Sequence, residues 1–229
     1  MSPLISANMQ AIVFDAVGTL IHPDPPAADV YAEAGRLFGS GLSSVEIASR
    51  FRTAFRRQEE IDFATGLRTS EARELERWRA IVAEVLDDVK EPKACFRHLY
   101  DHFARPETWR IEADAKATLA KLEERGYRTA IASNFDHRLR GVLAPGELGR
   151  LPLIISAEIG WRKPAPGFFD AVCRSMVAEP QNVLHVGDQL ENDYAGARSA
   201  GFAAVMFDPE GKCPANVLRI SQLGELIGA

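Results

Sequence analysis

The sequence has few cysteines and no excess of positive charge. Its 229 residues include three cysteines, and no two of them form a C-x-x-C pair. A disulfide framework or a structural zinc site is therefore not expected, and a reducing compartment such as the cytoplasm is favoured. The formal net charge is −5, so the chain lacks the basic surface that attracts nucleic acid. We expect a small-molecule ligand and no nucleic-acid partner.

Long hydrophobic runs are also missing. No stretch approaches the ~20 apolar residues that a membrane-spanning helix needs, so no membrane partner is expected. Residues 1–8 have neither a basic start nor an apolar core, and we interpret them as a disordered leader, not as a signal peptide. The sequence does not indicate an oligomeric state.

Short apolar runs alternate with amphipathic segments after Pro106. The runs predict strands at 10–14, 128–133, 153–156, 183–186 and 203–207. The segments between them predict helices at 114–124, 166–176 and 192–200. Such alternation is typical of a parallel sheet covered by helices, so we predict an α/β fold with a Rossmann-like core.

Residues 27–105 follow a different pattern, in which helical periodicity replaces strands. Ser43 and Glu46 form a capping box that opens a helix, and Ile47, Phe51 and Phe55 then share one face of it. We expect about four helices here, packed as a small bundle. The predicted organisation is an α/β core at 1–21 and 106–229, with a helical insert at 22–105.

Polar residues follow the predicted strands where each strand ends. Ligands bind beyond the carboxyl ends of the strands in an open parallel sheet. The candidates there are Asp15, Ser133, Asn134, Lys163, Asp188 and Asp193. Three carboxylates in one crevice repel one another unless a cation offsets them, and oxygen ligands suit Mg²⁺. With the lysine and two hydrogen-bond donors, this set can hold a phosphoryl group in line with an Asp nucleophile.

These residues resemble four ordered motifs of the haloacid dehalogenase superfamily. The segment 14–20, Phe-Asp-Ala-Val-Gly-Thr-Leu, resembles its first motif, D-x-D-G-T, with one change. Ser133 matches the second motif, Lys163 the third, and Gly187-Asp188 with Asp193 the fourth. The resemblance covers nearly all of the chain, and the helical insert after the first motif is similar to the cap of subclass I.

The resemblance implies a role for each matching residue. Asp15 would be the nucleophile that forms an aspartyl-phosphate. Mg²⁺ would be bound by Asp15, the Val17 carbonyl and Asp188, with Asp193 as a ligand or as a residue behind the ligands. Substrate phosphate would be held by Ser133, Asn134, Lys163, Gly18 and Thr19, and the partner would be a small phosphorylated substrate.

Val17 departs from the family pattern. Phosphatases of the family carry a second Asp at this position, which protonates the leaving group and then activates water. General acid–base catalysis contributes roughly 10²–10⁴-fold, so weak phosphatase activity is expected unless another group substitutes. His22, Asp24 or a residue of the insert are the candidates, whereas His185 is expected to be a core histidine.

Four functions stay open at this point. The first is a Mg²⁺-dependent phosphatase of low or selective activity. The second is a regulatory module that binds metal and phosphate without turnover. The third is a 2-haloacid dehalogenase, which suits Val17 because halide leaves without a proton, although dehalogenases of the family use no Mg²⁺ and lack an equivalent of Asp188. Phosphonatase or mutase chemistry is the fourth.

Overall fold

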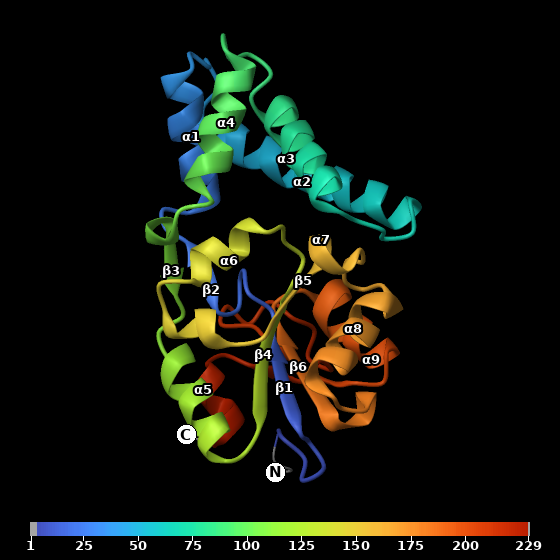
Figure 1. Ribbon diagram of the computed structural model, residues 1–229. Helices are drawn as coiled ribbons and strands as arrows, with labels where there is room; N and C mark the ends of the chain where they lie inside the picture. Colours follow the sequence, from blue (N-terminus) through green and yellow to red (C-terminus); the bar gives the residue numbers. More distant parts are fainter. Residues whose placement is uncertain (1–3, 229) are drawn as a thin grey trace.

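The structure is a computed structural model that describes residues 4–228. A six-stranded parallel sheet forms its centre, in the order β5-β4-β1-β6-β7-β8 (Figure 1). The strands are β1 Ala11–Phe14, β4 Arg128–Ser133, β5 Leu153–Ile155, β6 Val183–Gly187, β7 Ala203–Phe207 and β8 Arg219–Ile220. The five predicted strands and the α/β class are confirmed. The two-residue β8 was not predicted, because it is too short to produce a periodic pattern.

Strand β1 lies between β4 and β6, and this placement creates the crevice. The chain runs from β1 to β4 and β5 on one side, and then returns to pair β6 with the other side of β1. Phe14 is in register with Ile131 of β4 and with Val186 of β6. The residues that follow these strands therefore meet at one edge, at the point where the strand order reverses.

The sheet is buried on both faces because alternate residues of each strand enter different cores. In β1, Ile12 and Phe14 belong to one apolar cluster, and Ala11 and Val13 belong to the other. Helices α5 (Ala115–Glu124) and α6 (Arg138–Leu143) pack on the first face. Helices α8 (Pro166–Met176) and α9 (Gly196–Ser199) pack on the second face (Figure 1). Burial on both faces is typical of parallel sheets.

Four helices lie at one end of this core and form what we call the four-helix segment (Figure 1). They are α1 Ala27–Leu37, α2 Ser44–Ala64, α3 Glu71–Val85 and α4 Pro92–His102. They share an apolar cluster of their own, separate from the two around the sheet. The Ser43–Glu46 capping box at the start of α2 is confirmed, with the Ser43 N–H donating to Glu46 Oε2 at 2.9 Å. Between 27 and 102 the chain is helical and contains no strand.

Two short strands join the four-helix segment to the core, and neither was predicted. Strand β2 (Ile21–Pro23) pairs antiparallel with β3 (Trp109–Ile111). Three residues with a proline give too little alternation to be recognised from sequence. The pair brings the two chain crossings together, so the segment is attached through a two-stranded stalk.

Three other expectations need correction or comment. Residues 1–3 of the expected leader lie outside the described residues, but Ile5 is buried in the core and Asn8 Nδ2 donates to the Gln181 carbonyl at 2.9 Å. The leader is therefore packed from residue 4 onward. The helix expected at 192–200 is a π-helical turn, Leu190–Ala195, followed by α9. Among the described residues, no helix combines the length and apolarity needed to cross a membrane.

A buried ionic cluster holds α2 to α3. Asp62 is 1% exposed and pairs with Arg77, also 1% exposed, and with Arg73 at 2.6 Å. We expect Asp62→Ala to lower the free energy of unfolding by about 3–5 kcal/mol, because it leaves a buried guanidinium without its carboxylate. Urea unfolding measures this. The control is Asp87→Ala, which removes an exposed carboxylate 2.5 Å from Arg50 and should cost much less. Equal losses in the two variants would contradict the assignment.

Candidate functional site

The Lys163 ammonium lies between two buried carboxylates at the carboxyl end of the sheet. Its Nζ donates to Asp15 Oδ1 and to Asp193 Oδ1, each at 2.6 Å, and to the Ala132 carbonyl at 3.1 Å. Asp15, Lys163 and Asp193 are 5%, 2% and 1% exposed. Burial alone would lower the pKa of Lys163, but the two carboxylates hold it above its usual value. The lysine is therefore a fixed cation.

Asp193 has partners on both of its oxygens. Besides Lys163, Oδ1 lies 2.9 Å from Nε2 of His185, and Oδ2 accepts the Gln189 N–H at 3.0 Å. Burial opposes ionisation, but Lys163 and His185 hold the pKa of Asp193 well below its usual range. The π-helical turn and the missing Cβ of Gly187 let Asp193 approach, because a Cβ there would lie 2.2 Å from the Asp193 carboxyl carbon. His185 is buried and hydrogen-bonded, as predicted.

Asp188 is a carboxylate without a matching cation. Its Oδ1 is buried and has no hydrogen-bond partner among residues 4–228. Burial, with added repulsion from Asp15 and Asp193, raises the pKa of Asp188 to about 8. Gly18, at φ +95°, allows this approach, because a Cβ there would lie 2.3 Å from Asp188 Oδ2. Burial likewise raises the pKa of Asp15, although Lys163 opposes it.

These groups together fit a divalent cation. One oxygen from each of Asp15, Asp188 and Asp193 lies within 4.8 Å of the others. Three carboxylates and one ammonium leave an excess of negative charge in a buried place, and the unpartnered Asp188 oxygen faces no donor. Hard oxygen ligands of this kind suit Mg²⁺. Asp15 and Asp188 are the ligands with free oxygens, whereas Asp193 is already engaged through both of its own.

The remaining predicted residues lie at the same edge but differ in what they contact. Ser133 is buried at the end of β4 and lines the cavity described below, as do Asn134 and Val17. The Asn134 side chain binds the Lys163 backbone, accepting its N–H at 2.7 Å and donating to its carbonyl at 3.0 Å. These two bonds position Lys163, and one side-chain N–H of Asn134 is left for a ligand.

Two predicted substrate-binding residues do not face the cavity with a free donor, although the Thr19 hydroxyl has no hydrogen-bond partner among residues 4–228. Thr19 is fully buried and is not part of the cavity lining. The Gly18 N–H donates to the Ile21 carbonyl at 2.9 Å, so it is not available to a phosphate oxygen. The geometry gives Gly18 a packing role against Asp188, and gives Thr19 a place behind the crevice. Sequence reasoning could not separate these roles, because a turn residue and a ligand-binding residue look the same in one sequence.

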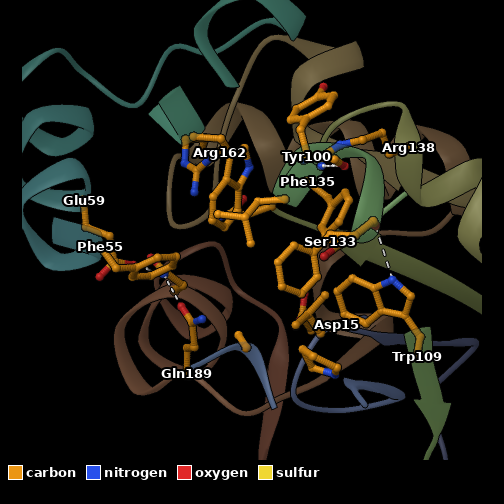
Figure 2. A pocket seen from close by; sticks show the side chains of 18 of the residues that line it. Asp15, Phe55, Glu59, Tyr100, Trp109, Ser133, Phe135, Arg138, Arg162 and Gln189 are labelled. Atoms are coloured by element: carbon orange, nitrogen blue, oxygen red, sulfur yellow. Dashed lines mark hydrogen bonds between the residues drawn. The ribbon is translucent and has the colours of Figure 1, made fainter. Parts of the chain in front are cut away.

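A cavity of about 160 Å³ lies between this edge of the sheet and the four-helix segment. Figure 2 shows Asp15, Ser133, Phe135 and Trp109 lying together, with Phe55 and Glu59 across from them. Most of the lining is aromatic or aliphatic, and every helix from α1 to α4 contributes to it. The helical pattern predicted that these side chains pack together, but which of them face a cavity is a tertiary property.

Two of the side chains considered as substitutes for the missing acid, His22 and Asp24, are not in this cavity, whereas Glu59 of the insert lines it. His22 Nε2 lies 2.9 Å from Glu112 Oε2, and Asp24 is exposed. Neither lines the cavity. Burial together with Arg110 lowers the pKa of His22, so it is a poor proton source at neutral pH. Val17 itself lines the cavity, and its side chain carries no proton to give.

Known proteins resemble this chain in both sequence and fold. A family model of haloacid dehalogenase-like hydrolases matches residues 9–201. The chain belongs to this family. The human "Haloacid dehalogenase-like hydrolase domain-containing protein 3" is 30% identical to it over 203 residues, covering 85% of this chain and 80% of that protein.

Two solved structures extend the comparison. A phosphatase of the family from Thermococcus onnurineus is 25% identical, with a TM-score of 0.67, over 96% of this hydrolase and 97% of that chain. A dehalogenase solved with an intermediate complex has a TM-score of 0.76 over 98% of both chains. At 22% identity it shows the shared fold alone. The predicted family and fold are thereby confirmed.

Arg162 is a residue that sequence reasoning missed. It is 5% exposed, pairs with Glu74 of α3, and its N–H donates to the Leu67 carbonyl at 3.0 Å. The loop that carries Lys163 is therefore tied to the four-helix segment. The only signal in the sequence was an arginine next to the lysine, which is common on solvated surfaces.

The charge of Asp188 leads to a stability prediction for this hydrolase. Its pKa of about 8 lies above the ordinary 3.8, so between those pH values the folded state keeps a proton that the unfolded state has lost. Stability therefore falls as pH rises through this window. In EDTA at pH 8, Asp188→Asn should melt several degrees above the unmodified protein, and the gap should close near pH 4. Differential scanning fluorimetry measures both.

Mg²⁺ gives the matched test of the cation site. It should raise the melting temperature of the unmodified hydrolase and of the control Asp170→Asn, which changes an exposed carboxylate on α8. Asp188→Asn should show little response, because binding to the folded state alone is what raises the melting temperature. An equal response in all three proteins would show that Asp188 does not hold the cation.

Proposed function

We propose that this hydrolase is a Mg²⁺-dependent phosphatase that acts on a small phosphate ester through an aspartyl-phosphate at Asp15. The observation that carries the proposal is the buried Asp15–Lys163–Asp193 arrangement beside the unpartnered Asp188 carboxylate. A fixed ammonium on one oxygen of Asp15 orients the other as a nucleophile. A cation held beside it would neutralise the charge of an incoming phosphate.

The proposed metal ligands are Asp15, the Val17 carbonyl and Asp188. When bound, Mg²⁺ supplies positive charge for the transferring phosphoryl oxygens. Asp193 acts behind them, because both of its oxygens are engaged by Lys163, His185 and the Gln189 N–H. Its role is to fix Lys163 and to balance its charge.

Phosphate binding is proposed for Ser133 and Lys163, with the free N–H of Asn134 as a third donor. Ser133 lies at the end of β4 next to β1, so its hydroxyl and Asp15 share one edge of the sheet. We propose that the four-helix segment acts as a cap that covers Asp15 and contacts the leaving group. The domain boundaries that belong to this proposal are a core at 1–21 and 106–229 and a cap at 22–105.

Activity is proposed to be weak toward ordinary alkyl phosphates. Position 17 is a valine, where a general acid would protonate the departing alkoxide. Neither His22 nor Asp24, which could substitute for that acid, lines the cavity. The missing acid corresponds to a loss of roughly 10²–10⁴-fold. A binding module without turnover is the alternative that Val17 favours.

A 2-haloacid dehalogenase is less well supported by the charges around the cavity. Its substrate carries a carboxylate, which needs a free cation. Arg138 and Arg162 line the cavity but already pair with Asp136 and Glu74. The Glu59 carboxylate lies on the same cavity and would repel a second anion.

Restoring the acid tests this proposal. Val17→Asp should raise kcat/KM for ethyl phosphate by roughly 10–100-fold with Mg²⁺ present, because a carboxyl group then protonates the alkoxide. Val17→Asn is the control of equal size, and it should give no gain. No gain from Asp, in a folded protein that binds Mg²⁺, would count against the phosphatase function.

The covalent step has its own readout. Brief incubation with acetyl phosphate and Mg²⁺ should add one phosphoryl group to Asp15, detected by mass spectrometry after acid quench. Asp15→Asn should remain unlabelled. Labelling that persists in Asp15→Asn would exclude Asp15 as the nucleophile.

A further inference from the structure

The cavity above Asp15 is shaped by apolar side chains from both parts of the molecule. The four-helix segment contributes Tyr31, Phe55, Val82 and Leu99, one from each helix. The core side contributes Trp109 and Phe135, whose rings pack edge to face with centroids 6.0 Å apart. The volume of about 160 Å³ is close to the ~150 Å³ of an apolar cavity that binds benzene. One aromatic ring therefore fits.

The two arginine side chains of the cavity are already paired. Arg138 binds Asp136 through two hydrogen bonds, at 2.8 and 2.7 Å, and stacks on the Tyr100 ring at 3.6 Å. Arg162 pairs with Glu74 of α3, and its Nε lies 3.5 Å from Asp62. Neither guanidinium is left to bind a second anionic group. Bisphosphates therefore do not suit this lining. The polar side chains Glu59, Gln189 and Asn192 also line the cavity but bond to one another, which leaves fewer donors and acceptors for the hydroxyls of a sugar phosphate.

Tyr31 adds no charge to the lining. Burial raises the pKa of its hydroxyl above the usual value, despite the opposing effect of Arg138, so the ring stays a neutral phenol. Val17 adds an apolar side chain close to the nucleophile. A leaving group in this cavity would depart without a proton donor at position 17, which favours one that is stable as an anion. A phenol, with a pKa near ~10, leaves far more readily than an alkoxide.

We propose that the substrate is a phosphate monoester of a phenol with a single ring, bound with the ring in this cavity. The proposal rests on the phosphatase function above. A carboxylate oxygen of Asp15 attacks phosphorus, the P–O bond to the ring oxygen breaks, and its electron pair leaves with the phenolate. Solvent protonates the phenolate, and water then hydrolyses the aspartyl-phosphate to give inorganic phosphate and free Asp15. The net reaction consumes one water.

Four substrates separate ring binding from leaving-group ability. Phenyl phosphate has both a ring and a good leaving group. Cyclohexyl phosphate has a ring of similar size but a poor leaving group. Acetyl phosphate has a good leaving group without a ring, and ethyl phosphate has neither. We expect kcat/KM for phenyl phosphate to exceed that for ethyl phosphate at least 100-fold. Cyclohexyl phosphate should compete with phenyl phosphate while turning over slowly.

A cavity-filling variant tests whether the substrate ring binds in this cavity. Ala27 lines the cavity at the start of α1, so Ala27→Phe occupies space without removing a buried group. It should raise KM for phenyl phosphate at least tenfold and leave acetyl phosphate turnover unchanged. Ala80→Phe, on the exposed face of α3, is the matched control and should change neither. Thermal unfolding shows whether the variants remain folded.

The outcomes distinguish failure of this inference from failure of the phosphatase function. Turnover of acetyl phosphate, with phenyl phosphate no better than ethyl phosphate, would overturn the aryl substrate and leave the phosphatase standing. An unchanged KM in Ala27→Phe would also overturn ring binding in this cavity. No turnover of acetyl phosphate or phenyl phosphate, with Mg²⁺ bound, would overturn both.

Discussion

The site of this hydrolase depends on one ammonium group held between two buried carboxylates. Lys163 contacts Asp15 and Asp193 at 2.6 Å each, and all three side chains are almost fully buried. Removing Lys163 would leave two buried carboxylates without their shared cation, which is costly in a medium of low dielectric constant. The interaction therefore fixes the position of Asp15, the proposed nucleophile.

The loop that carries Lys163 is held from both sides. Asn134 binds its backbone from the core, and the Leu67 carbonyl accepts the N–H of Arg162 from the four-helix segment. The Thr69 N–H also donates to the Gly160 carbonyl at 3.2 Å. Movement of the four-helix segment would disturb these bonds next to the lysine. The position of the four-helix segment and the geometry of the site are thus linked through this loop.

The excess of carboxylates and the apolar cavity lie side by side, and each limits the chemistry of the other. Asp188 is a half-buried acid whose buried Oδ1 has no partner among residues 4–228, and this is a cost to stability that a bound cation would remove. On the other side of Asp15, Val17 and the aromatic side chains make most of the lining apolar, and position 17 offers no proton. Such a site is suited to leaving groups that are stable as anions in apolar surroundings.

The sequence alone determined the fold class, the four helices of the insert together with α5 and α8, and the set of acidic and basic residues at the strand ends. Those features are local, because strand runs, the Ser43–Glu46 capping box and residues that follow strands leave patterns within a few positions. Only the tertiary structure decided that Asn134 holds Lys163, that Gly18 packs against Asp188, and that Thr19 lies behind the crevice. It also decided which aromatic side chains face a cavity and that Arg162 is paired, because these depend on how distant segments pack and not on the spacing of residues along the chain.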